Sequence, residues 1–379
     1  MQITPLLLLS LFGSSYCVVF PHAARATTVV LSTTEGASST ASNPSLTTTT
    51  VIPNPSCIAS PSAAKIPESA FSTVYTLPNG HYAENLAVRS NGKVLVTVIG
   101  APEIWQIDPV TSTGQLLYTF PGGPDDGNCT LGITEYAPDK FAVAVGKFNI
   151  PTVSGVASSW AIWSFDLSAG DVGVSPKIIT AIAPAVFLNG LTSQPPNKSG
   201  HFLLVADSYL GIIYRIDITK GTWTTFLDDP SLKRNASAAI QLGVNGIRVH
   251  NNYLYFDNSG QAPMFARVLV STDLKAIGSV EVIVAAAAFP VNAQYYGYDD
   301  FAFNGNGDAW MATNPSRSIV KIHSDGRQFV EVGGLNEGTL TGCTSVQFGR
   351  GSESTILYVN VNAQGGKLLK VDTVSPPPC

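Results

Sequence analysis

Four short motifs place an oxygen-bearing side chain at one recurring position along the chain. Each begins with Glu, Asn or Asp and has an apolar residue two places later: Glu84-Asn85-Leu86, Asn189-Gly190-Leu191, Asn245-Gly246-Ile247 and Asp299-Asp300-Phe301. Two carboxylates and two amides that converge on one axis would form a cage of oxygen ligands, which suits Ca²⁺ or Mg²⁺ better than a soft metal. Alternatively, the Asn-Gly pairs are simple turns and Asp299-Asp300 is a solvated loop. The shared position in a repeat favours the cage.

The elements that must position these residues are short strands in a unit that repeats between about residues 71 and 372. Each unit has an anchor residue, apolar residues two and four places later, a tight turn and two further β-rich runs. Six anchors follow one another at spacings of roughly 45 to 60 residues: Glu84, Cys129, Asn189, Asn245, Asp299 and Thr344. The sequence therefore predicts an all-β fold, a six-bladed β-propeller of four-stranded blades. A pair of β-sandwiches would not repeat its anchor six times.

The two ends of the repeat region predict how the ring closes. The sixth unit runs out of chain after Asp372, whereas residues 72–77 precede the first unit and have no other partner. We expect this N-terminal strand to complete the last blade, which would remove an open sheet edge. The predicted propeller domain spans residues 63–379.

The first residues are expected to be a targeting signal and not part of the folded domain. An apolar run extends to Phe20, and Ala24-Arg25-Ala26 matches a cleavage signal, so residues 1–26 are expected to be a signal peptide. Residues 27–62 are rich in Ser, Thr, Ala and Pro and are expected to be a flexible leader. Sequons for N-glycosylation occur at Asn128, Asn197 and Asn235. These features predict a secreted protein or one held in the lumen of the secretory pathway.

Four cysteines remain after removal of the signal peptide, and an oxidising compartment would pair them. They allow three pairings, and their spacing with His does not match a zinc site. Ring closure brings the two chain ends together, which favours a Cys57–Cys379 bond. The second predicted bond, Cys129–Cys343, would join blades two and six.

Composition excludes several classes of partner. The chain has 379 residues, 21 Lys plus Arg against 26 Asp plus Glu, and only 12% charged residues. Nucleic-acid binding needs clustered basic side chains, so no nucleic-acid partner is expected. After the N-terminus no apolar run reaches the roughly 18 residues of a membrane span. We expect a monomer or a homodimer that acts on small molecules.

The four motifs resemble the inner-strand motifs of the senescence-marker-protein/gluconolactonase family over residues 71–372. The resemblance implies that Glu84, Asn245 and Asp299 ligate a divalent metal and that Asn189 lies near the substrate. Lactonases of that family use the metal to polarise a lactone carbonyl. A metal-dependent lactonase or esterase is therefore one interpretation, and a non-catalytic ligand-binding propeller is another.

One departure from that family changes the expected substrate. Where its sugar-lactone hydrolases tend to carry Arg two residues before the third-blade Asn, this chain has Phe187. Together with Tyr295 and Tyr298, this residue predicts an apolar, aromatic substrate pocket. Such a pocket favours a flat or hydrocarbon substrate, because a sugar's hydroxyl groups would lose their hydrogen bonds there.

The signal peptide, Ser/Thr leader and terminal cysteines also resemble secreted fungal members that include hetero-Diels–Alderases of tropolonic sesquiterpenoid biosynthesis. The resemblance implies coupling of a tropolone o-quinone methide to an alkene such as humulene, in fungal meroterpenoid biosynthesis. This reaction needs no cofactor, but it needs a donor or a cation on the heterodiene oxygen. Candidate catalytic residues are His81, Tyr82, Asn189 and Asn245. A pericyclase is thus the leading functional prediction.

Overall fold

The computed structural model describes residues 66–121, 128–149, 152, 154–194, 201–238, 241–260, 264–285, 297–334, 338–363 and 365–374. All of them belong to one compact unit of the chain. Their regular structure is β-strand apart from short 3₁₀ turns, which include η3 (Pro78–Gly80), η4 (Pro230–Leu232) and η6 (Gly351–Glu353). In this part of the chain no helix is long and apolar enough to cross a membrane.

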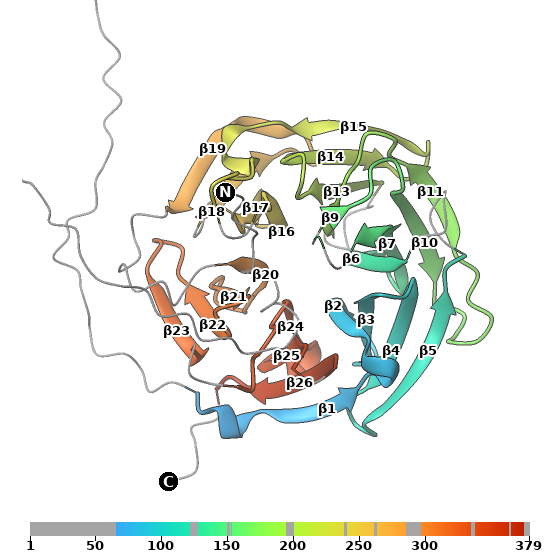
Figure 1. Cartoon of the computed structure of the whole chain (residues 1–379), viewed down its shortest axis with the longest axis vertical. Helices are drawn as coiled ribbons and strands as arrows, with labels where there is room; N and C mark the ends of the chain where they lie inside the picture. The colour runs from blue at the N-terminus through green and yellow to red at the C-terminus, as the bar shows by residue number, and fades with distance from the viewer. Residues whose placement is uncertain are drawn as a thin grey trace, which may run out of the picture. The chain divides into compact units, whose positions relative to one another are not determined.

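Four separate antiparallel sheets have four strands each and are arranged in the manner of propeller blades (Figure 1). The first three are β12 (Leu188–Ser193) to β15 (Thr222–Leu227), β16 (Val244–His250) to β19 (Ala276–Val284) and β20 (Tyr298–Phe303) to β23 (Gln328–Gly333). Their middle strands are β13 (Phe202–Asp207), β14 (Ile212–Asp217), β17 (Tyr253–Asn258), β18 (Met264–Val270), β21 (Ala309–Thr313) and β22 (Ser318–Ile322). The fourth contains β24 (Ser345–Phe348), β25 (Ile356–Val361), β26 (Lys367–Asp372) and β1 (Ser72–Thr76).

The predicted first and second blades lie together in one eight-stranded sheet. Their ladders are connected by a single residue pair, Ile99 with Cys129. The first ladder holds β2 (Tyr82–Val88), β3 (Val94–Ile99), β4 (Glu103–Asp108) and β5 (Thr113–Thr119). The second holds β6 (Cys129–Ala137), β7 (Lys140–Gly146), β10 (Ala161–Asp166) and β11 (Lys177–Ala181). A small hairpin of β8 (Phe148–Asn149) and β9 (Ser154–Gly155) follows β7.

The inner strands form a ring around a central channel, whose cavity is lined by Leu86, Ile133, Leu191 and Val249 among others, and the N-terminal strand closes the ring. β2, β6, β12, β16, β20 and β24 each pack beside the next, and β24 returns to β2 (Figure 1). β1 pairs antiparallel with β26, so that Ser72 lies opposite Lys370. The predicted closure by this strand is therefore confirmed, and it covers an edge that could otherwise pair with another chain.

The core lies between neighbouring sheets rather than in the channel. One buried cluster joins Leu131 of β6, Leu191 of β12 and Val205 of β13 with Trp160 and Phe187, which precede β10 and β12. Another joins Leu204 of β13 to Ile247 of β16 and Phe256 of β17. Burying a large apolar side chain contributes about 1.5–3 kcal/mol. The channel walls are thus held by packing on their outer sides, which leaves the inner strands to carry polar groups.

Candidate active site

A β-bulge occurs at the same place in five of the inner strands. In β16, for example, Val244 pairs with Asn258 and Ile247 with Phe256, so two residues oppose one on the partner strand. The same shift in register spans residues 83–86, 130–133, 188–191 and 298–301. A bulge bends its strand and re-aims the extra side chain. This device positions Glu84, Asn189, Asn245 and Asp299, the four predicted anchors with oxygen-bearing chains.

The other two predicted anchors need correction. In β6 the first residue of the bulge is Leu131, two positions after the expected anchor Cys129. The pairing of β24 shows no shift in register, and Thr344 precedes that strand. Thr344 instead donates hydrogen bonds to the backbone carbonyls of Ala83 and Glu84 in the neighbouring blade. It holds the first inner strand in place rather than presenting a ligand.

Glycine at the second bulge position brings adjacent inner strands close together. A Cβ on Gly132 would lie 2.1 Å from the backbone oxygen of Asn189, and one on Gly190 would lie 2.3 Å from that of Asn245. Real Cβ atoms do not approach so closely, so these positions require glycine. The Asn-Gly motifs are therefore neither simple turns nor solvated loops. Because each glycine lacks a side chain, the backbone of the anchor residue in the next inner strand can approach it closely.

Three predicted site residues lie together with Asn314, which was not predicted, at the end of the channel where the bulges are. The Asn245 side-chain amide donates to Asp299 Oδ1 over 2.9 Å and to Ser259 Oγ over 3.0 Å. Asn314 donates from its own amide to Asp299 Oδ2 and to the Tyr82 hydroxyl oxygen, both over 3.4 Å. Tyr82, Asn245 and Asp299 therefore share one hydrogen-bonded cluster that spans three blades.

Glu84 belongs to the same cluster through its charge. Burial raises its pKa well above the ordinary value, and the carboxylates of Asp299 and Asp300 raise it further. Burial and the charge of Asp300 also raise the pKa of Asp299 to about 8, although hydrogen bonds from Asn314 and Asn245 oppose the shift. Burial, together with Glu84 and Asp299, raises the pKa of the Tyr82 phenol. Burial and mutual repulsion thus hold these groups towards their neutral forms, and a positive charge placed among them would favour their ionised forms.

The predicted metal ligands have the chemistry that a hard divalent cation prefers. Glu84, Asn245 and Asp299 carry carboxylate and amide oxygens, the ligand type of Ca²⁺ and Mg²⁺, and burial and neighbouring acidic groups raise the pKa of both carboxyl groups. Asn245 presents its nitrogen to Asp299, so ligation through its oxygen would require the amide to turn. Among the described residues, no group of three or more His, Cys, Asp or Glu side chains is placed to hold a metal. The amide would therefore be an essential ligand.

Asn189 and His81 have different positions from this cluster. Asn189 is buried, with 2% of its surface exposed, at the bulge of β12. His81 directs Nδ1 towards Glu103 Oε2 at 3.4 Å and meets the edge of Trp105, on the outer side of β2. Among the described residues, His81 therefore contacts Glu103 and Trp105 rather than the members of the cluster. His81 caps the end of the turn η3 whereas Tyr82 begins β2, and the two side chains have different partners.

Two of the residues predicted to line the substrate pocket, Tyr298 and Phe187, are buried in apolar clusters. Tyr298 is fully buried among the side chains of Tyr255, Phe265 and Phe301, and its hydroxyl donates to Gln328. It is a core residue and not a channel residue, because it faces opposite to Asp299 on β20. Phe187 is 3% exposed and stacks on Phe148 at 4.9 Å between ring centroids. Its cluster also touches the partly buried Tyr82.

The predicted Cys129–Cys343 bond is not formed. Both thiols are free and buried, and the thiol of Cys129 donates to the carbonyl of Gly146 over 3.1 Å. The strands beside them, β6 and β24, lie on either side of β2, whereas a disulfide needs Cα atoms within about 7 Å. Cys57, Cys379, Tyr295, Asn197, the signal peptide and the leader lie outside the described residues. The glycosylation candidates Asn128 and Asn235 are exposed.

Sequence reasoning missed Asn314, Asn362 and Ser259. Each immediately follows the second strand of its blade, on the same side of the ring as the bulges. Asn362 makes two hydrogen bonds to the backbone of Ala83. Its side-chain oxygen accepts from the Ala83 N–H, and its side-chain nitrogen donates to the Ala83 carbonyl oxygen. A comparison of the repeats at the end of the second strand, and not only at the start of the first, could have found them.

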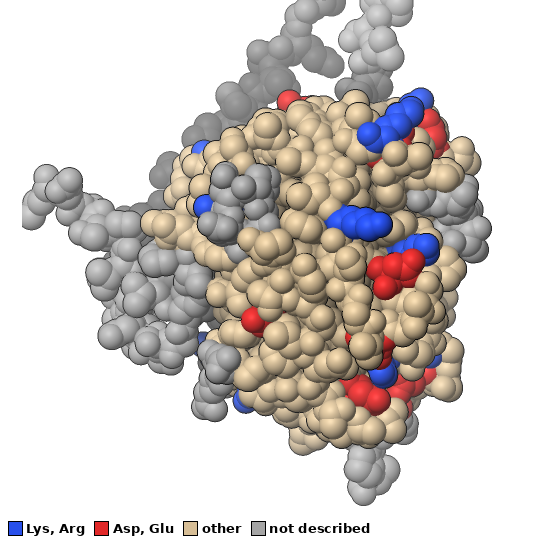
Figure 2. Space-filling view, turned by 90° about the vertical axis from the view of Figure 1, so that its right-hand side faces the viewer, with Lys and Arg blue, Asp and Glu red and all other residues tan. Residues whose placement is uncertain are grey.

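The face shown in Figure 2 carries no extended basic patch, because its Lys and Arg side chains are few and scattered, and some of them lie beside Asp or Glu. This surface is consistent with the composition and offers no phosphate-binding stripe. The polar cluster in the channel is the stronger candidate for chemistry.

Comparison with known proteins gives no match to any family model. The chain is 26% identical over 337 residues to a Sarocladium schorii protein named "Putative hetero-Diels-Alderase asR5", covering 79% of this chain and 78% of that protein. It is 24% identical over 311 residues to a Phoma sp protein named "Putative hetero-Diels-Alderase", covering 75% of this chain and 84% of the relative. The resemblance predicted from the sequence is thereby confirmed.

Solved structures share the fold at low sequence identity. A luciferin-regenerating enzyme aligns with a TM-score of 0.53 and 14% identity, over 78% of this chain and 94% of that one. The calcium-binding protein regucalcin from Agrobacterium tumefaciens aligns with a TM-score of 0.50 and 14% identity, over the same shares of the two chains. These structures support the propeller arrangement and nothing more specific.

Proposed function

We propose that this protein is a hetero-Diels–Alderase that couples a tropolone-type o-quinone methide to an alkene such as humulene. The names of the two curated relatives support a pericyclase-type activity. We also propose that the eight-stranded sheet counts as two blades, because one residue pair joins its halves. The fold would then be a six-bladed propeller with the reaction at the bulged end of its channel.

The observation that carries the proposal is the hydrogen-bonded cluster of Tyr82, Asn245, Asp299 and Asn314. A cycloaddition forms one C–C and one C–O bond and releases no leaving group, so it requires no nucleophile. It requires a donor at the heterodiene oxygen, where negative charge develops. A phenol is neutral at physiological pH, and Tyr82 could therefore donate to that oxygen while Asn314 holds its hydroxyl in place.

The buried setting suits the other needs of this reaction. Two reactants held face to face avoid much of the entropy cost of a bimolecular encounter. A quinone methide must also be kept from water. Phe148 and Phe187 stack on each other within an apolar cluster against which Tyr82 packs. Apolar groups beside Tyr82 would favour hydrocarbon and aromatic partners over sugar lactones.

A divalent cation is an optional part of this proposal. Glu84, Asn245 and Asp299 would hold Ca²⁺ or Mg²⁺, which when bound would polarise an oxygen of the substrate as a Lewis acid. The cycloaddition itself needs no cofactor. The names of the two relatives do not favour the lactonase interpretation. A non-catalytic binding propeller is one outcome of the test.

The test is a rate measurement with the full-length protein purified from a secreting host. The quinone-methide precursor and humulene are incubated with protein, with protein plus chelator, and with buffer, and the adduct is quantified by mass spectrometry. Faster adduct formation with protein supports the proposal, and the chelator arm decides whether a cation takes part. If the adduct forms at the buffer rate although the substrates bind, the proposal is wrong and the protein is a non-catalytic binding protein.

A further inference from the structure

A cavity lies between the inner strands on the side away from the bulges. Its lining residues follow the bulges along the inner strands, and they include Leu86 of β2, Ile133 of β6, Leu191 of β12 and Val249 of β16. The cavity has a volume of about 220 Å³. None of the residues that line it is Phe, Tyr or Trp. The pocket is therefore distinct from the candidate active site, and it offers no surface on which a base or a sugar ring could stack.

Two arginines reach this cavity from different blades. Arg350, just after β24, donates through Nη2 to Glu135 Oε2 of β6 over 2.6 Å. Arg248 of β16 donates through one nitrogen to the carbonyl of Ile247 and through the other to Asp300. A guanidinium group has five N–H donors. Within the described part of the chain, Arg350 uses one of them and Arg248 uses two, so both have donors to offer a ligand.

The acids paired with these arginines limit the charge that a ligand can carry. Glu135 is 7% exposed and also accepts from the backbone N–H of Asp139, so it is fixed in place. Asp300 is 2% exposed. Two positive and two negative groups sum to zero charge, so a ligand with a single negative charge is accommodated more easily than a dianion such as phosphate. The arginine forks match the planar geometry of a carboxylate.

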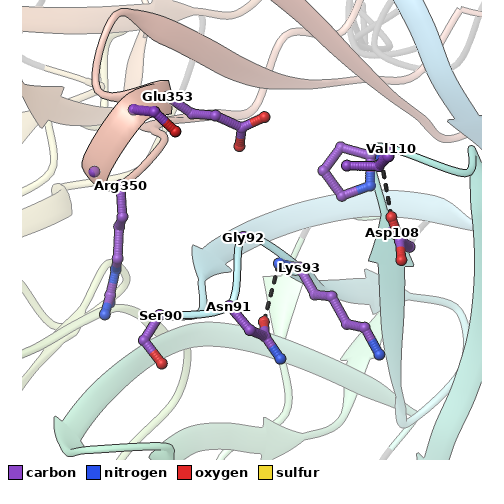
Figure 3. Close-up of a pocket in the computed structure, with 11 residues that line it drawn as sticks. Ser90, Asn91, Gly92, Lys93, Asp108, Val110, Arg350 and Glu353 are labelled. Carbon is purple, nitrogen blue, oxygen red and sulfur yellow. Dashed lines mark hydrogen bonds between the residues drawn. The ribbon is translucent and has the colours of Figure 1, made fainter.

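Arg350 also lines a neighbouring cavity of about 430 Å³ on the outer surface. That cavity is formed by the turn at Ser90–Lys93, the end of β4 and the turn of η6 (Figure 3). In Figure 3 the side chain of Arg350 extends away from Glu353. Because Arg350 lines both cavities and its side chain is 40% exposed, a ligand can reach the arginine from solvent.

We propose that this end of the channel binds a small organic monocarboxylate between Arg350 and Arg248. The carboxylate accepts hydrogen bonds from the two guanidinium groups, and the apolar body of the ligand lies against Leu86, Ile133 and Leu191. Binding involves no covalent step. The site is independent of the reaction proposed for the opposite end of the channel.

Calorimetric titration of the full-length protein with benzoate and hexanoate tests the proposal, with benzamide and hexanamide as neutral matches. The wild type should bind each acid at least tenfold more tightly than its amide. Arg350→Gln should weaken acid binding about tenfold, because it removes a charge-assisted hydrogen bond. Arg327→Gln is the matched control, since Arg327 is 61% exposed and pairs only locally with Asp325; it should leave binding unchanged.

A second variant changes the affinity in the opposite direction. Glu135→Gln removes the charge that competes for Arg350 while keeping an acceptor for the Asp139 N–H, and it should tighten acid binding severalfold. If Arg350→Gln does not fold, two other measurements test the proposal. These are the ratio of acid to amide affinity in the wild type and the change in acid affinity caused by Glu135→Gln. Equal binding of acid and amide, the absence of binding at millimolar acid, or an unchanged affinity in a folded Arg350→Gln protein would each overturn the proposal.

Discussion

The side-chain amide of Asn245 donates to Asp299 Oδ1 over 2.9 Å, and so connects the bulges of two neighbouring inner strands. Each side chain has its position because its strand carries one extra residue there. The polar cluster therefore depends on how the inner strands approach one another. Changes to the bulges should disturb the site even when they leave its side chains intact.

Gly190→Ala tests this dependence. The new Cβ would lie 2.3 Å from the backbone oxygen of Asn245, so the strands must separate, and we expect a loss of about 1–3 kcal/mol in unfolding free energy. Urea denaturation measures the loss. Gly305→Ala is the matched control, since its Cβ meets no heavy atom within 4 Å. If the two variants are equally stable, the close approach of these inner strands is not required.

Tyr82→Phe tests the proposed donor. The substitution removes one hydroxyl and keeps the ring in its cluster with Phe187. We expect adduct formation to slow by about a hundredfold to a thousandfold, as for the loss of one preorganised donor, while the melting temperature changes little. The initial rate at saturating substrate measures the effect. An unchanged rate would assign activation of the heterodiene to another group.

Asp171→Asn should give a pH-dependent loss of stability. Burial tends to raise the pKa of Asp171, but hydrogen bonds from Lys93, Arg89 and Gln106 outweigh it and hold this pKa below the ordinary value. A carboxylate with a depressed folded-state pKa contributes stability above about pH 4, and this contribution is lost as the pH falls through the folded pKa. We expect the variant to lose about 1–3 kcal/mol at pH 7.

Urea denaturation at pH 7, 4 and 2 measures this difference, which should shrink towards pH 2. Asp228→Asn provides the control, because Asp228 is 55% exposed in its ion pair with Lys233 and should contribute at most about 1 kcal/mol. A difference from wild type that stays constant from pH 7 to pH 2 would contradict the role assigned to the ion pairs of Asp171.

The two buried thiols give a prediction about covalent structure. Cys129 and Cys343 are free, and burial raises the pKa of both thiols. We expect iodoacetamide to modify them slowly in the native protein and fully after unfolding in guanidinium without reductant. Peptide mapping by mass spectrometry measures both states. A disulfide-linked peptide pair containing Cys129 and Cys343 would contradict the structure.

The repeat pattern predicted much of this architecture because strand alternation and spacing are local properties. Closure by residues 72–76 and the meeting of Glu84, Asn245 and Asp299 followed from placing equivalent residues at equivalent points. The bulges were not predicted, since a shift in register depends on the partner strand. For that reason the second-blade anchor was placed at Cys129 instead of Leu131.

Side-chain direction limited the prediction of the site. His81 and Tyr82 are adjacent in sequence, yet one meets Trp105 and the other approaches Asp299. Tyr298 and Asp299 diverge in the same way. Asn314 lies after the second strand of its blade, where no search of first-strand motifs would find it.

The most direct measurement is the stereochemical composition of the adduct, determined by chiral chromatography and mass spectrometry. The full-length protein is incubated with humulene and the quinone-methide precursor, beside a buffer reaction and a Tyr82→Phe reaction. We predict one dominant stereoisomer with wild-type protein, formed faster than in buffer, because the channel would hold the partners in one orientation. An adduct formed at the buffer rate with the same mixture of isomers would contradict the proposed cycloaddition.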